Sequence, residues 1–231
     1  MSQFAPEDTA RHYQNAHDRI VELVRPLSDE QAATPVPAAP GWDVHDVLAH
    51  LAANTTDGIA GRIRGIPDDA FTSEQVRQRK AATIDDLVAE WKGNMPTMLE
   101  AARAGLAPPP LAADALSHEQ DIRGALGVAR VDDPAAVRFG LELFALGLQL
   151  RLKETPGLAL RIEATDSDFT AVAGDGEPTA TLRASEFELF RTLSGRRGRS
   201  AVLALEWDSD ATPYLPWLNA FGALPEYDVT D

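Results

Sequence analysis

Residues 154–165, ETPGLALRIEAT, mark the point at which the periodicity of the sequence changes. Before this stretch, apolar residues recur every three or four positions, as on one face of an amphipathic helix. Within and after it, apolar residues alternate with polar ones or run in short pieces bounded by Gly, Asp and Pro, which is typical of strands. The sequence therefore predicts a helical first part and a mixed second part.

The first part is predicted to be an all-helical bundle of four long helices with additional shorter ones. Asp43 and Thr83 can each cap a helix, because an aspartate follows each of them three residues later. The proline-rich stretch AATPVPAAPG, residues 32–41, separates the first two helices. We expect helices over residues 6–27, 44–64, 84–105, 111–127 and 134–154, and a shorter one over 73–82.

The second part is predicted to be a small α+β domain. Ser185 and Glu188 can cap a helix over residues 186–195, and a last helix is expected near residues 214–222. We expect strands over residues 158–165, 169–174, 179–185 and 200–207. The fold class is thus α followed by α+β, with two domains over residues 1–155 and 156–231.

Composition and charge exclude several classes of protein. The chain has 231 residues and a formal net charge of −15, so nucleic acid and anionic membranes are not expected as partners. The start of the sequence has no basic segment followed by an apolar one, and no apolar stretch is long enough to span a bilayer, so a cytoplasmic protein is expected. There is no cysteine, so any thiol chemistry needs a thiol from outside.

A candidate metal site follows from helical geometry. Asp114 and His118 are four residues apart, so they lie about 40° from each other on one helical face, with His118 near the middle of the apolar stripe. His50 lies at the edge of the apolar stripe of its own helix. Two imidazoles and one carboxylate make a three-ligand set that leaves a position for water or substrate. These ligands suit zinc or non-haem iron.

The same residues also have a structural interpretation, in which His118 is a core histidine whose polar atoms are satisfied by a neighbouring acid. Asp121 can orient a ligand from behind, or form a surface salt bridge with Arg123 or Arg103. The three remaining histidines are expected at the surface: His12, His17 and His45.

The segment GRRGRS, residues 195–200, is basic in an otherwise acidic chain. Arg196 and Arg197 are candidates for binding a substrate carboxylate through paired hydrogen bonds. Alternatively, they are cations that follow a helix C-terminus because the helix dipole favours them there.

Two motifs resemble those of a known family: PGWDVHDVLAHL, residues 40–51, and LSHEQDIRGALG, residues 116–127. The sequence is similar over nearly its whole length to the mycothiol-dependent maleylpyruvate isomerase family. That family has a DinB-like four-helix bundle followed by a small α+β domain similar to sterol carrier proteins. The resemblance implies that His50, Asp114 and His118 hold the metal. The family's isomerase has glutamate where this chain has Asp114.

The resemblance also implies an activity. The cofactors would be a divalent metal, with zinc expected, and mycothiol, whose sulfur would act as a metal-bound nucleophile. The reaction would be isomerisation of, or S-transfer to, a small electrophilic substrate. One alternative is a non-catalytic protein that binds a small ligand and has a structural or vestigial metal site. Another is a non-haem iron oxygenase.

Overall fold

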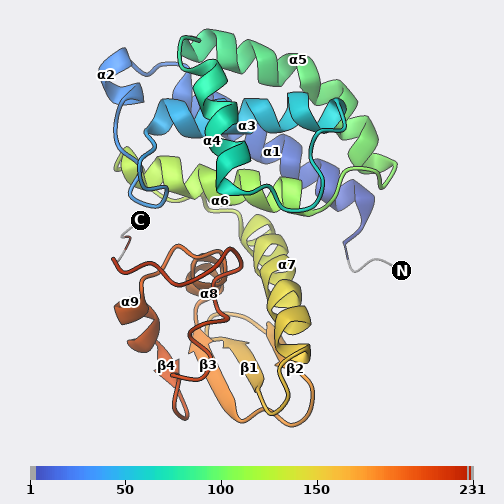
Figure 1. Cartoon of the computed structure of the whole chain (residues 1–231), viewed down its shortest axis with the longest axis vertical. Helices are drawn as coiled ribbons and strands as arrows, with labels where there is room; N and C mark the ends of the chain where they lie inside the picture. Colours follow the sequence, from blue (N-terminus) through green and yellow to red (C-terminus); the bar gives the residue numbers. More distant parts are fainter. Residues whose placement is uncertain (1–3, 228, 230–231) are drawn as a thin grey trace. The chain divides into compact units, whose positions relative to one another are not determined.

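Figure 1 shows the computed structural model, which describes residues 4–227 and residue 229. Contacts divide the chain into two compact units, one reaching to Val131 and the other beginning at Asp132. The regular elements of the first unit are helices, and the second unit combines helices with a small mixed sheet. The predicted order, α followed by α+β, is therefore confirmed.

Four long helices of the first unit form a bundle. α5 packs against α1 and α3, and α6 packs against the same two helices, so the four enclose one core. Buried aromatic and aliphatic side chains such as Trp91, Ile20 and Leu48 fill it. The helices of this unit are α1 (Pro6–Val24), α2 (Asp29–Ala32), α3 (Val44–Ile59), α4 (Asp69–Arg79), α5 (Ile84–Arg103) and α6 (Pro110–Ala125).

The predicted caps start two of these helices. The Asp43 side chain accepts a hydrogen bond from the backbone N–H of Asp46, and Thr83 and Asp86 form a reciprocal capping box. α3 ends at Ile59 and not near residue 64, because Gly61 takes a positive φ of 66° that breaks the helical path. None of the helices in the described part of the chain has the length and apolar content that a bilayer span requires.

The second unit contains a four-stranded sheet in the order β2-β1-β3-β4. β1 pairs antiparallel with β2 and parallel with β3, and β4 pairs antiparallel with β3. The parallel β1–β3 pair makes the sheet mixed, as in other α+β folds. The elements are α7 (Pro134–Lys153), β1 (Ala159–Ala164), β2 (Thr170–Gly174), β3 (Ala180–Ala184), α8 (Glu186–Leu193), α9 (Arg199–Leu203) and β4 (Glu206–Trp207).

The division of the chain differs from the boundary expected after residue 155. α7 groups with the second unit because it packs against α8 and β2. Gly140 permits this close packing, since a Cβ atom there would lie 2.5 Å from the Phe190 ring. Phe144 also meets Phe190, at a ring-centroid distance of 5.9 Å. The apolar face of α7 thus covers the sheet domain's core.

Two predicted elements of the second unit are wrong. Residues 200–207 were expected to be a strand, but α9 occupies their first half and only Glu206–Trp207 pair in the sheet. A short apolar run cannot be assigned to helix or strand by periodicity alone. Residues 214–222 form consecutive turns in place of a helix, and Pro216 removes a backbone donor from their middle.

Candidate metal site

The structure brings the three predicted ligands together within the first unit. His50 comes from α3, and Asp114 and His118 come from neighbouring turns of α6. The Nε2 atom of His50 lies 3.5 Å from Oδ2 of Asp114, and Nε2 of His118 lies 3.5 Å from Oδ1 of the same carboxylate. The two imidazole ring centroids are 5.4 Å apart. One ligand atom from each residue lies within 4.8 Å of the other two.

These distances fit a metal ion. Zinc bonds to histidine and carboxylate are about 2.0–2.2 Å long, so two ligand atoms of a tetrahedral site lie about 3.4 Å apart. Both histidine–aspartate distances are close to that value, each to a different oxygen of the Asp114 carboxylate. Two imidazole nitrogens and a carboxylate oxygen are also ligands that Zn²⁺ and Fe²⁺ accept. The residues present can therefore hold a divalent ion with small adjustments of the side chains.

The three side chains differ in their exposure to solvent. The side chains of His50 and His118 are 7% and 8% exposed, whereas the Asp114 side chain is 29% exposed. The imidazoles are thus covered by the bundle, and the carboxylate is at the open side. A site with three protein ligands and an accessible side has room for water or substrate as a further ligand.

Polar side chains surround His50 on both sides of its ring. Its Nδ1 atom lies 3.0 Å from Oε1 of Gln75, and its Nε2 atom lies 3.1 Å from Nδ2 of Asn54. The Asn54 amide also donates a 3.1 Å hydrogen bond to Oδ2 of Asp114. The centre of the Trp42 ring, which belongs to the sequence motif PGW, lies 5.3 Å from the centre of the His50 ring. Each polar atom of His50 therefore has a neighbour that fixes its orientation.

His118 is supported by a carboxylate. Oδ2 of Asp121 lies 2.9 Å from Nδ1 of His118, within ion-pair distance, although the N–H direction is poorly aligned for a hydrogen bond. The Asp121 side chain is fully buried. Arg123 pairs with Glu119 and Arg103 pairs with Glu7, and a role for Asp121 in orienting His118 stays a prediction. Carboxylates commonly orient metal-bound histidines in this way.

The expected surface positions of two other histidines are wrong. His12 and His17 are buried in α1, and His17 packs edge-on against Trp91 at a centroid distance of 4.8 Å. Burial lowers the pKa of His17, against the opposing effect of its contact with Asp18. His45 is only partly exposed, with its Nε2 atom 2.8 Å from the carbonyl oxygen of Ala82.

Tyr13 is a buried phenol that the sequence analysis did not single out for the site. Trp91 donates a 2.9 Å hydrogen bond from Nε1 to its hydroxyl oxygen. Burial raises the pKa of Tyr13 well above its usual value, and the Asp114 carboxylate adds to this rise. The phenol therefore stays protonated at neutral pH, in the electrostatic neighbourhood of a candidate ligand.

Arg196 and Arg197 lie in the second unit, where both are buried. Arg197 forms two hydrogen bonds with the carboxylate of Glu188, at 2.7 and 2.9 Å. Arg196 donates a 2.6 Å bond to the Ser194 carbonyl oxygen and lies 5.9 Å from the centre of the Phe221 ring. Both guanidinium groups thus have partners within the protein, and a role in binding substrate stays a prediction.

Two further features are potential binding sites. Asp43, His45 and Asp46 form a second group of potential ligands, but Lys80 places its ammonium group 2.8 Å from Asp46 and so supplies the positive charge there.

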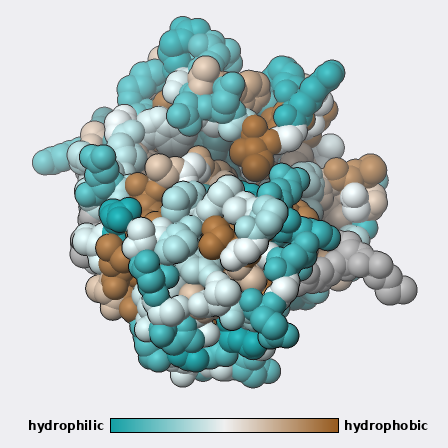
Figure 2. Space-filling view, turned by 60° about the horizontal axis from the view of Figure 1, so that its bottom comes forward, coloured by the Kyte–Doolittle hydropathy of each residue, from teal (hydrophilic) through white to brown (hydrophobic). Residues whose placement is uncertain are grey.

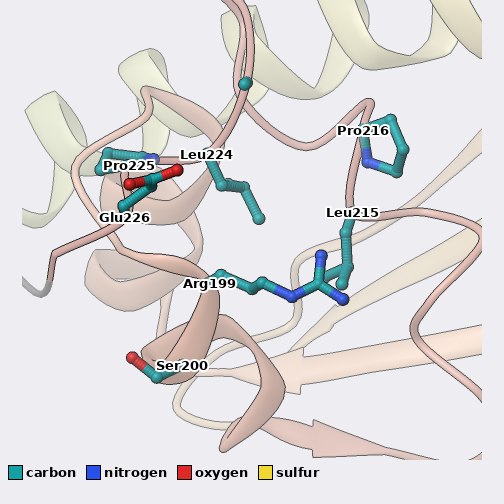
Figure 3. A pocket seen from close by; sticks show the side chains of 8 residues that line it. Arg199, Ser200, Leu215, Pro216, Leu224, Pro225 and Glu226 are labelled. Atoms are coloured by element: carbon teal, nitrogen blue, oxygen red, sulfur yellow. The ribbon is translucent and has the colours of Figure 1, made fainter.

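The second unit has a pocket of about 540 Å³ beside α9, where the exposed Arg199 extends toward Leu215 (Figure 3). Its lining residues are Arg199, Ser200, Leu215, Pro216, Ala223, Leu224, Pro225 and Glu226.

Comparison with known proteins identifies the family. The family model described as the mycothiol maleylpyruvate isomerase N-terminal domain matches residues 13–138, a range that includes the whole candidate site. The match covers more than half of the chain. The protein therefore belongs to the mycothiol maleylpyruvate isomerase family.

Two solved structures share the fold. Both are crystal structures of a mycothiol-dependent maleylpyruvate isomerase, one of them a histidine-to-alanine mutant, and both are 14% identical to this chain. The alignments cover 89% of this chain and 93% of the other, with a TM-score of 0.60 for the mutant and 0.56 for the second structure. No curated protein sequence gives a significant match.

Proposed function

We propose that this protein is a metal-dependent enzyme that uses an external low-molecular-weight thiol, mycothiol, for isomerisation of, or S-transfer to, a small electrophilic substrate. The observation that carries this proposal is the convergence of His50, Asp114 and His118 at distances suited to one ion. Membership of the family and the names of the two similar structures support the choice of thiol.

Each residue of the site has a defined role in this proposal. His50 and His118 would bind the ion through their Nε2 atoms, and Asp114 would supply the one negatively charged ligand. A bound divalent ion, with zinc expected, would keep a coordinated thiol deprotonated at neutral pH. The chain has no cysteine, so the thiol has to come from solution.

The surrounding residues would hold the two imidazole ligands in position. Asp121 and Gln75 stand behind the two imidazoles, at 2.9 and 3.0 Å from their Nδ1 atoms. The Trp42 ring covers one side of His50 and limits the access of water there. The partly exposed edge of the site beside Asp114 would admit the substrate.

The first experiment measures metal content. The purified protein is expected to contain one equivalent of zinc, and His50→Ala, His118→Ala and Asp114→Ala are each expected to lose it. His45→Ala is a matched control, because His45 is on the same helix as His50 but outside the three-ligand group. Stoichiometric metal in His50→Ala would contradict the proposed ligand set.

The second experiment measures the reaction. The zinc-loaded protein is expected to isomerise maleylpyruvate only when mycothiol is added, as followed by absorbance and by product chromatography. Turnover without any thiol would contradict the proposed chemistry. Retention of metal without isomerisation would direct the search to other electrophiles, tested by loss of the free thiol in the presence of each compound.

The alternative is a non-catalytic protein that binds a small ligand. The pocket beside α9 favours it, because Leu215 and Leu224 offer apolar contacts and Arg199 offers a positive charge (Figure 3). That pocket is partly open, and on the face shown in Figure 2 hydrophobic side chains form small separate patches. The alternative predicts ligand binding that is unchanged in a His50→Ala/His118→Ala variant. An iron oxygenase, in contrast, would contain iron and consume oxygen.

A further inference from the structure

We propose that Asp57 and Gln75 are positioning residues that fix the tautomer of His50, so that its Nε2 atom presents a lone pair to the metal site. This inference rests on the proposed metal-binding function and adds two residues that do not touch the ion. Both side chains are buried, and they come from different helices, Asp57 from α3 and Gln75 from α4.

Asp57 determines which way the Gln75 amide points. Nε2 of Gln75 lies 2.6 Å from Oδ2 of Asp57, and Arg62 donates a 2.7 Å hydrogen bond to the other carboxylate oxygen. If the amide were reversed, its oxygen would face a carboxylate oxygen at that distance, and both atoms are acceptors. The amide nitrogen therefore faces Asp57, and the amide oxygen faces His50.

Gln75 in turn determines where His50 carries its proton. Oε1 of Gln75 lies 3.0 Å from Nδ1 of His50 and can only accept a hydrogen bond. Nδ1 must therefore be the protonated nitrogen. A neutral imidazole has one ring proton, so Nε2 keeps its lone pair for a metal ion.

Asn54 gives the same result from the other side of the ring. The second N–H of Gln75 donates to Oδ1 of Asn54 at 3.2 Å, which directs the Asn54 amide nitrogen toward Nε2 of His50 and Oδ2 of Asp114, both at 3.1 Å. An N–H donor beside Nε2 requires a lone pair there. Two separate contacts of His50 thus select one tautomer.

The two candidate histidine ligands differ in how a carboxylate supports them. The Asp121 carboxylate lies directly beside Nδ1 of His118. Beside Nδ1 of His50 lies the neutral amide of Gln75, and the Asp57 carboxylate contacts that amide. The Asp57–Gln75 pair therefore gives His50 its orientation without a second negative charge in contact with the ring. Residues in this position commonly change metal affinity 10- to 100-fold when mutated.

The test measures zinc affinity by competition with a chelating dye. Asp57→Asn replaces a pure acceptor by an amide, so Gln75 is free to turn, and we expect the zinc Kd to rise about 10- to 100-fold. Gln75→Leu removes both the acceptor beside Nδ1 of His50 and the donor to Asn54, and the same loss is expected.

Glu74→Gln is the matched control. Glu74 neighbours Gln75 on α4 but pairs with Arg77 on the surface, so zinc affinity should not change. Circular dichroism of each metal-free variant checks folding. Leucine is the replacement at position 75 because it is similar in size to glutamine and forms no hydrogen bond.

A second measurement is independent of the metal. Two-bond ¹H–¹⁵N correlation spectra of the metal-free protein, at a pH where His50 is neutral, should show its proton on Nδ1, and Asp57→Asn should show a mixture of tautomers. A proton on Nε2 in the original protein would overturn the inference. So would a zinc Kd within twofold of the original in Asp57→Asn and Gln75→Leu, provided that His50→Ala abolishes binding. If His50→Ala still binds zinc, the proposed metal site itself is wrong.

Discussion

Zinc is expected to raise the thermal stability of the first unit by a predictable amount. An ion that binds the folded state alone stabilises it by about 2.7 kcal/mol when its free concentration is 100 times the Kd. The site lies within about 130 residues of one compact unit, for which the unfolding entropy is about 0.28 kcal/mol/K. The ratio of these values gives a rise in Tm of about 10 °C.

The assay is differential scanning calorimetry of protein stripped with a chelator and then titrated with zinc. Two transitions are expected if the units unfold separately, and zinc should move the one that belongs to the helical unit. Asp114→Ala removes one of three ligands and should abolish most of the shift, whereas His45→Ala should keep it. A shift below about 1 °C at saturating zinc, or an equal shift in Asp114→Ala, would refute the reasoning.

Three further predictions concern stability away from the site. Burial lowers the pKa of His17, so the unfolded chain binds more protons than the folded chain as the pH falls. The free energy of unfolding, measured by urea titration, should therefore decrease as the pH falls below about 6.5. The decrease should be smaller in His17→Gln. The side chain of Glu119 is fully buried and accepts hydrogen bonds from Arg19 of α1. Glu119→Gln should lower the free energy of unfolding of the first unit by about 2–4 kcal/mol in the same urea titration. An unchanged urea midpoint would contradict this. Gly140→Ala should cost the second unit about 1–2 kcal/mol through its clash with Phe190, while zinc affinity, as the control, stays unchanged.

The sequence was sufficient to predict the order of the fold and the proximity of His50, Asp114 and His118 in the candidate site. The change in periodicity near residue 154 separates helical from mixed structure, and local caps such as Asp43 act within one turn. Asp114 and His118 are adjacent by helical geometry alone. Such features depend on neighbours in sequence, so they can be read without the tertiary structure.

Contacts between helices were harder to predict. Gln75 belongs to a polar stretch of α4 with no apolar stripe, and its burial depends on how α4 crosses α3. One signal was available: His50, Asn54 and Asp57 follow each other at intervals of four and three, which places all three on one face of α3. A polar row on the buried side of a helix indicates a network of hydrogen bonds.

Whether α7 belongs to the first or the second unit, and whether His17 is buried, both depend on the segments against which they pack. Periodicity shows that α7 has an apolar face, but not whether that face meets a bundle or a sheet. His17 lies in a helix with polar neighbours, and it is buried where its ring packs against Trp91 of α5. Both are properties of packing between distant segments.

The greater exposure of Asp114 has a consequence for the order in which ligands arrive. Without a bound ion, the entrance presents a carboxylate in a chain with a net charge of −15, so it attracts cations and repels anions. A divalent ion bound to one carboxylate and two neutral imidazoles would carry a remaining charge of about +1 and reverse that local potential. The same entrance would then favour the thiolate of the proposed cofactor, so the thiol and the metal should bind cooperatively, with the metal entering first.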